Sequence, residues 1–413
     1  MLKTEFYETA VRQGFYGIDE GGIAGKKDNV RKYWEDVFIK LSLREAVASL
    51  LAEKGGALRI VDLGAGSGEG LDLLTHIPIP AQGATGLATH FVLSQEQIAK
   101  YVGVDISPAM VVQGRANYAG RANVRFEEAD LGDGFPLEGE SPFDIYFSSY
   151  SSLSHITDAE LAALTRQIMR HARGRAFLVY DLFGRFSPEW PQYWAADARE
   201  QRPYNMAYLL RPEERTAERI ENFPVTYWSA AELEALVAEA AHATGRRATV
   251  KVLKDRSILV GRHMDTGLFN AHPRDVRRAV NCLFERDYRG DAAHLGVDLK
   301  FLDAYRNVRP EAHEQIRQHH ADWMTVVCTY TALATSDNTT VKRLIESARP
   351  DLSEELKMLA WVFRNAARFP VVDFWASVMG PQVACVLRNL EYALPRGLGC
   401  GHGLLAVVEI TDK

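Results

Sequence analysis

The sequence predicts an α/β fold, in which a mostly parallel sheet of seven strands carries helices on both faces and is accompanied by a mainly helical region. Two observations lead to this prediction. Between residues 57 and 263, short apolar runs alternate with segments whose apolar residues recur every three or four positions. After residue 264 the helical period dominates. We therefore expect N-terminal helices over 1–56, a sheet domain over 57–263 and a mainly helical domain over 264–413.

Seven apolar runs are predicted to be the strands of this sheet. Five of them alternate with helical segments, which indicates parallel pairing, and the last two are predicted to form a terminal hairpin. A helix between the last parallel strand and the hairpin begins at a capping box, in which Glu232 follows Ser229 by three residues. The predicted strands are 58–63, 101–105, 124–127, 143–147, 175–180, 249–253 and 257–261.

Two long insertions interrupt the sheet domain, at 75–100 and 182–228. Insertions of this length are usually functional loops or caps. The second is rich in Trp and Tyr, which either wall a binding pocket or only pack the insertion onto the sheet. A glycine-rich stretch within 1–56 is expected to be a loop or a lid.

Composition excludes several classes of protein. The chain has 413 residues, of which 47% are apolar and 25% charged, as in globular proteins of two or three domains. A net charge of -6 argues against broad electrostatic capture of nucleic acid or membrane. Four scattered cysteines predict neither a disulfide scaffold nor a metal site. Without an apolar span or a signal peptide, we expect a cytoplasmic protein that contacts no membrane.

A glycine-rich loop is the strongest chemical signal. Residues 61–68, VDLGAGSG, directly follow a predicted strand and precede a helix. Glycines allow the backbone to turn sharply there and to approach a ligand closely. A dinucleotide-binding loop has a third glycine where this chain has Glu69, and an acid is unfavourable beside a pyrophosphate, so NAD and FAD are disfavoured.

Acidic residues after the next two strands complete a nucleoside-binding pattern. Asp105 follows the second strand, where a carboxylate can accept hydrogen bonds from both ribose hydroxyls. Residues 126–131, FEEADL, end the third strand and offer a carboxylate to an exocyclic amine. Asp62 has two interpretations of equal weight, a contact to the ligand or a carboxylate that holds the glycine loop.

These motifs, with FDIYFSSYSSLSHITD after the fourth strand, resemble the class I S-adenosylmethionine-dependent methyltransferases over about residues 57–263. The resemblance implies a Rossmann-like domain with S-adenosylmethionine as cofactor. Its implied cofactor-binding residues are Asp62, Gly64, Gly66 and Gly68 near the methionine moiety, Asp105 on the ribose, Ile106, Asp130 and Leu131 at the adenine, Ser148 after the fourth strand, and Tyr33 or Arg31 at the methionine carboxylate.

The acceptor is expected to be a small molecule, methylated on oxygen, nitrogen or carbon, in secondary metabolism. The resemblance supports this because Ser148–Ser151 replace the Asn-Pro-Pro-Tyr type of motif that related enzymes use for nucleobase amines. His155 is the candidate general base, since an imidazole has a suitable pKa. Its alternative is a packing or capping role.

Two alternatives stay open. One is a reaction of the sulfonium other than methyl transfer, such as cyclisation or elimination. The other is methylation of RNA or protein, with the helical region as the binding surface, because arginines are dense over residues 274–289. The helical region is otherwise expected to wall the acceptor pocket or to form a homodimer interface.

Overall fold

A seven-stranded sheet forms the centre of the computed structural model, which describes residues 28–79, 91–272, 275–287 and 290–413 and a few positions before residue 19. The strand order is β3-β2-β1-β4-β5-β9-β8. Five strands are parallel and the last two are antiparallel to their neighbours, which confirms the predicted fold class. The strands are β1 (Leu58–Leu63), β2 (Ile98–Asp105), β3 (Val124–Glu128), β4 (Ile145–Phe147), β5 (Ala176–Phe183), β8 (Arg247–Arg256) and β9 (Gly403–Thr411).

Strand β9 corrects the predicted hairpin. The partner of β8 is not the run 257–261 but β9, which pairs with it from Arg256 opposite Gly403 to Arg247 opposite Thr411. On its other side β9 pairs with β5. The residues between β8 and β9 are therefore an insertion into the sheet domain, and the predicted boundary at 263 separates two parts of one sheet. Local patterning could not show this, because the partner strands lie far apart in the sequence.

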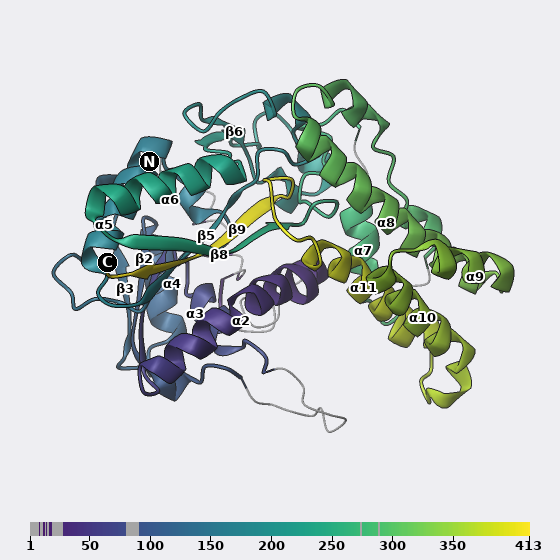
Figure 1. Cartoon of the computed structure of the whole chain (residues 1–413), viewed down its shortest axis with the longest axis horizontal. Coiled ribbons are helices and arrows are strands. Elements are labelled where there is room, and N and C mark those ends of the chain that lie inside the picture. The colour runs from purple at the N-terminus through teal and green to yellow at the C-terminus, as the bar shows by residue number, and fades with distance from the viewer. Residues whose placement is uncertain are drawn as a thin grey trace.

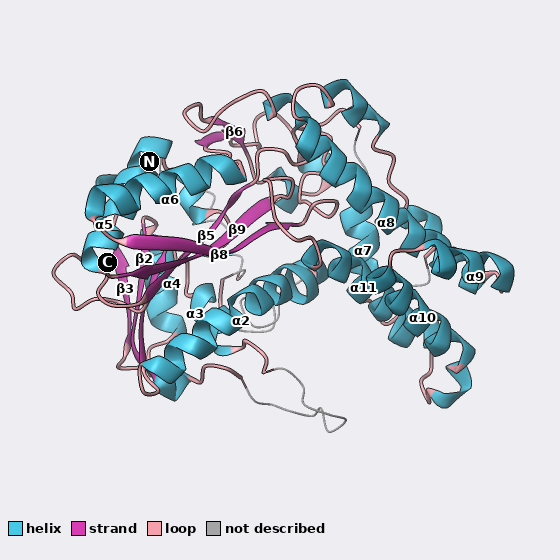
Figure 2. Cartoon of the chain, viewed as in Figure 1, coloured by secondary structure: helices cyan, strands magenta, loops and turns pink. Residues whose placement is uncertain are grey.

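Helices cover both faces of the sheet, as Figure 2 shows. The cluster of buried residues on one face includes side chains of the helices α5 and α6, and the cluster on the other face includes those of α2, α3 and α4. Both clusters contain alternate residues of the same strands, as expected for a sheet that is buried on both sides. The helices are α2 (Asp36–Glu53), α3 (Glu69–Thr75), α4 (Pro108–Asn117), α5 (Asp158–His171) and α6 (Ala230–Thr244).

The first insertion that the structure describes fully follows β5. It contains a small antiparallel pair, β6 (Arg202–Tyr204) and β7 (Phe223–Val225). Most of its aromatic side chains form a buried cluster of their own, among them Trp190 and Tyr227. Of the other predicted insertion, 75–100, residues 80–90 lie outside the described part of the chain.

The insertion between β8 and β9 is mainly helical and projects beside the sheet domain (Figure 1). Its own buried core extends to Val30 and Trp34, next to the π turn η1 (Arg31–Glu35). The N-terminal helical segment thus packs against both parts of the molecule. The elements of the insertion are α7 (Val276–Cys282), α8 (Pro310–Ala334), α9 (Asn338–Ser347), α10 (Pro350–Arg364), the π turn η11 (Trp375–Met379) and α11 (Gly380–Tyr392).

Two buried carboxylates fasten the ends of this insertion to the sheet. Glu391 accepts hydrogen bonds from the backbone N–H groups of Ser257 at 2.7 Å and Ile258 at 2.9 Å, where the chain leaves β8. Asp255 accepts them from Gly399 at 2.8 Å and Cys400 at 2.9 Å, where the chain approaches β9. Burial raises the pKa of Asp255 to about 6 and that of Glu391 to about 7. Among the described residues, no helix combines the length and apolarity that a membrane span requires.

Candidate functional site

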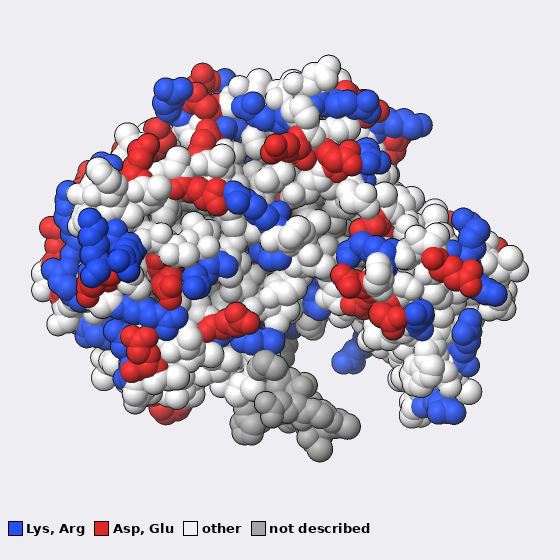
Figure 3. Space-filling model, in the orientation of Figure 1, with Lys and Arg blue, Asp and Glu red and all other residues white. Residues whose placement is uncertain are grey.

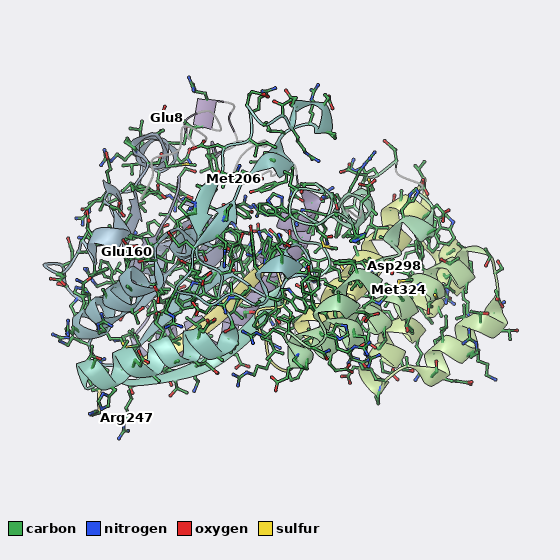
Figure 4. The ribbon with its side chains drawn as sticks, turned by 90° about the horizontal axis from the view of Figure 1, so that it is seen from above. Glu8, Glu160, Met206, Arg247, Asp298 and Met324 are labelled. Carbon is green, nitrogen blue, oxygen red and sulfur yellow. The ribbon has the colours of Figure 1, made fainter. Side chains whose placement is uncertain are left out.

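A cavity of about 810 Å³ opens at the carboxyl ends of β1 to β4. Its size is in the range of sites for cofactors and small molecules, roughly 300–1,000 Å³. The wall also includes residues of the first insertion and the first segment of the helical insertion. Figure 4 shows three lining residues from distant parts of the sequence, Glu8, Glu160 and Met206, on the same side of the molecule, away from Asp298 and Met324 of the helical insertion.

The three glycines after β1 have different surroundings. All have positive φ, 76° at Gly64, 52° at Gly66 and 97° at Gly68, which favours glycine. Gly64 and Gly66 line the cavity. A Cβ atom at Gly66 would meet only the Met110 sulfur, at 4.0 Å, so a ligand can approach the backbone there. Gly68 does not line the cavity, and a Cβ atom there would lie 2.5 Å from the Tyr118 ring, which indicates a packing role.

Asp105 is held at the cavity wall by backbone hydrogen bonds. One carboxylate oxygen accepts from the Gly66 N–H at 2.8 Å and the other from the Ser107 N–H at 2.9 Å. An ionised carboxylate has about four lone-pair sites, so two such bonds leave capacity for the hydroxyls of a ribose. Ile106 and Leu131 line the same cavity. The structure therefore brings together the predicted ribose residue and two predicted adenine residues.

Other predicted residues lie outside this wall. Asp62 is buried beneath α3 and accepts a hydrogen bond from the Tyr101 hydroxyl at 2.5 Å, and burial raises the pKa of Asp62 to about 7. This placement supports the second interpretation of Asp62, a carboxylate that holds the glycine loop. Asp130 accepts a hydrogen bond from the Gly132 N–H at 2.8 Å, and Ser148 is fully buried. Neither of these two lines the cavity.

The two N-terminal candidates are separated by the structure. Tyr33 stacks on Phe284 with ring centroids 4.9 Å apart and does not line the cavity, because its position in η1 points toward the helical insertion. Arg31 does line the cavity, where its guanidinium lies 4.1 Å above the Tyr150 ring and pairs with Glu69. The described residue Tyr16 also reaches the site, since its carbonyl accepts a hydrogen bond from the Ser67 hydroxyl at 2.9 Å.

Tyr150, which the sequence did not single out, occupies the middle of the site in an unusual conformation. Its φ is 53° and that of Ser151 is 63°, values that are rare for residues other than glycine. The Tyr150 N–H donates to Asp181 at 2.8 Å, and its hydroxyl donates to Asp36. Such strain persists only where the surroundings over-determine it, and it is common at functional sites.

A buried carboxylate, Glu35, connects this site to the helical insertion. It pairs with Arg277 at 3.0 Å, Arg262 at 3.1 Å and Arg256 at 3.5 Å. Burial alone would raise the pKa of Glu35, but these guanidinium groups hold it well below its usual value. Arg262 and Arg277 also line the cavity. No spacing in the sequence indicated this cluster, because its members come from three distant segments.

His155, the candidate base, lines the cavity and stacks on Phe223 with ring centroids 5.1 Å apart. Burial lowers the pKa of the imidazole to about 4. The ring is therefore neutral at physiological pH and is able to accept a proton. Within the described part of the chain, His, Cys, Asp and Glu form no group of three that would hold a metal ion.

The comparisons with known proteins agree with this site. Residues 79–174 match the family model described as a methyltransferase domain. The chain contains a class I S-adenosylmethionine-dependent methyltransferase domain. It is an enzyme, and S-adenosylmethionine is its cofactor, as predicted. The open backbone at Gly66 and the remaining lone pairs of Asp105 fit the nucleoside part of that cofactor.

Several solved structures are similar to this methyltransferase. An S-adenosylmethionine-dependent methyltransferase from Mesorhizobium loti is 20% identical, with 52% of this chain and 85% of that chain covered and a TM-score of 0.32. Streptomyces venezuelae DesVI is 15% identical, with 57% and 94% covered and a TM-score of 0.33. CalS10, an amino pentose methyltransferase from Micromonospora echinaspora, is 19% identical, with 61% and 93% covered and a TM-score of 0.31. No curated protein gave a significant match.

Proposed function

We propose that the enzyme transfers the methyl group of S-adenosylmethionine to an oxygen, nitrogen or carbon atom of a small molecule. One observation carries this proposal. The cavity that begins at the glycine loop continues between two insertions, which supply a wall of their own opposite the cofactor residues. A small acceptor held there would lie in the same cavity as the cofactor. A role in secondary metabolism stays a prediction from the sequence.

The two insertions contribute walls of different character. The first supplies mainly apolar side chains, Met206, Tyr208, Leu209 and Phe223. The helical insertion supplies mainly polar ones, Arg262, Asp265, Thr266, Arg277, Arg278 and Asn281. An acceptor with one apolar and one polar face matches this pocket.

The residues at the site supply orientation and a proton acceptor. S-adenosylmethionine, when bound, supplies a methyl group on a good leaving group, so alignment of the acceptor accounts for much of the rate. His155 is neutral and faces the cavity, and it is the residue we assign to accept the proton of an acceptor hydroxyl or amine. Phe223 fixes the plane of its ring.

The arginines of the helical region give little support to an RNA acceptor. Arg277 is buried and paired with Asp28 at 2.5 Å and with Glu35, while Arg278 lines the cavity. Arg274 and Arg289 lie outside the described residues. Positive and negative side chains are interspersed on the face seen in Figure 3. A neutral mixture of charges lacks the basic stripe that binds phosphates.

The test is a product analysis. The purified enzyme is incubated with S-adenosylmethionine and pools of small hydroxylated, amino and enol compounds, and the products are identified by mass spectrometry. We expect S-adenosylhomocysteine together with a methylated compound. Methylthioadenosine as the nucleoside product would contradict methyl transfer, and S-adenosylhomocysteine formed only with RNA or protein would contradict a small acceptor.

A further inference from the structure

An ion pair between Arg31 and Glu69 lies in the cavity wall beside the glycine loop. Arg31 belongs to η1, and Glu69 is the first residue of α3, directly after Gly68. Both line the cavity, although their side chains are only 20% and 14% exposed. A positive and a negative group, in contact with each other, therefore face the same space.

Contacts other than Glu69 also hold the Arg31 guanidinium. It lies 4.1 Å from the centre of the Tyr150 ring, a favourable cation–π distance. Tyr150 is in turn held by its hydrogen bonds to Asp36 and Asp181. The Nε atom of Arg31 is buried and has no hydrogen-bond partner among the described residues. Arg31 thus has a defined position and a donor that a ligand can use.

The position of Glu69 relative to Asp105 indicates which part of a ligand it meets. Asp105 binds the backbone of Gly66, near the middle of the loop, and marks the ribose end of the site. Glu69 lies three residues further along the same loop, at the end away from the adenine residues Ile106 and Leu131. A nucleoside held at Asp105 that extends along the loop brings its 5′ substituent to the Arg31–Glu69 pair.

In S-adenosylmethionine that substituent ends in an α-amino acid, which carries an ammonium and a carboxylate on one carbon. A zwitterion between Arg31 and Glu69 replaces one ion pair by two and leaves no buried charge without a partner, which is the condition for a favourable buried pair. Glu69 also stands where dinucleotide-binding loops have glycine. The acid that is unfavourable beside a pyrophosphate is favourable beside an ammonium.

We propose that Glu69 binds the α-ammonium group of the cofactor while Arg31 binds its α-carboxylate. The Arg31–Glu69 ion pair of the free protein is then exchanged for two ion pairs with the ligand. This inference rests on S-adenosylmethionine being the cofactor. It adds a cofactor-binding residue, Glu69, and makes the pair selective for ligands that carry a complete amino acid group.

Calorimetric titrations with two nucleosides test the exchange. S-adenosylhomocysteine carries the amino acid group, and methylthioadenosine lacks it. In Glu69→Gln and in Arg31→Gln, we expect S-adenosylhomocysteine to bind roughly 30-fold more weakly, because each variant leaves one buried charge of the ligand unpaired. Methylthioadenosine should bind within about twofold of wild type, because it does not reach the pair. Glu285→Gln removes a different carboxylate from the same cavity wall and should change neither affinity.

A desamino analogue of S-adenosylhomocysteine gives the sharper comparison. It should bind wild type and Glu69→Gln with similar affinity, since the group that Glu69 recognises is missing. An unchanged affinity of Glu69→Gln for S-adenosylhomocysteine would overturn the proposal. So would an equal loss for both nucleosides, because that points to a structural role in the loop. If wild type bound neither nucleoside, the cofactor assignment itself would be wrong, and this outcome is distinct from the other two.

Discussion

On the side of the glycine loop, the cavity wall comes from the short loops that directly follow β1, β2, β3 and β4. On the opposite side it comes from residues 201–224 and 262–285, which belong to two insertions. The first set lies together in any parallel sheet of this strand order. The second set meets only because β9 returns to the sheet and closes the helical insertion against it. Cofactor binding is thus built into the sheet, whereas acceptor binding depends on how the insertions are placed.

The largest effect expected on the cofactor side is that of Asp105→Ala. The variant loses hydrogen bonds from the charged carboxylate to the ribose, each worth about 1.5–3 kcal/mol, and we expect roughly 100-fold weaker binding of S-adenosylhomocysteine. Titration calorimetry measures this. If the affinity stayed unchanged, the ribose would be held elsewhere and the cofactor half would need to be redrawn.

On the acceptor side, His155→Ala should separate turnover from cofactor binding. We expect kcat to fall by about 10²-fold with an acceptor that must lose a proton, while the affinity for S-adenosylhomocysteine stays close to wild type. Because burial lowers the pKa of His155 to about 4, the rate assigned to it should not decline near pH 6.5 but only as the pH approaches 4. A rate that survives the substitution would mean that alignment alone supports the reaction.

The link between the two regions can be tested through Glu391. Burial raises its pKa to about 7, so the folded state binds this proton more tightly than the unfolded state does. Its contribution to the free energy of unfolding is then complete below the unfolded pKa near 4.5 and is lost as the pH rises through 7, by at most about 3 kcal/mol.

Glu391→Gln should remove this part of the pH dependence. Denaturant unfolding of both proteins between pH 4.5 and 8 measures the difference between their stabilities. Parallel curves for variant and wild type would show that Glu391 titrates alike in both states, and that the insertion is not fastened by a protonated carboxyl group.

The smallest effect is expected for Tyr33→Ala. This side chain lies against Phe284 and outside the cavity, so the affinity for S-adenosylhomocysteine should remain within about twofold of wild type. A larger loss in the same calorimetric experiment would return Tyr33 to the cofactor half. Arg31→Gln serves as the positive control from the same turn.

The cofactor half was largely accessible to sequence reasoning. The residues around Gly64, Gly66 and Asp105 follow strands whose apolar runs are visible locally, and their chemistry depends on positions only a few residues away. Asp62 and Gly68 show the limit of that reasoning. Both belong to the motif, yet Asp62 points beneath α3 and Gly68 against the Tyr118 ring, because packing behind the loop decides which side of it faces the ligand.

The sequence by itself determined the parallel sheet, the order of its first five strands along the chain and the chemistry of the loops after them, because these depend on local periodicity and on residue types at short spacing. Only the tertiary structure decided that β9 fills the gap between β5 and β8, that Glu35 gathers three arginines, and that Arg31 meets Glu69. Each of these contacts joins segments far apart in the sequence. They form because burying the sheet on both faces brings those segments together, and no local pattern records such a pairing.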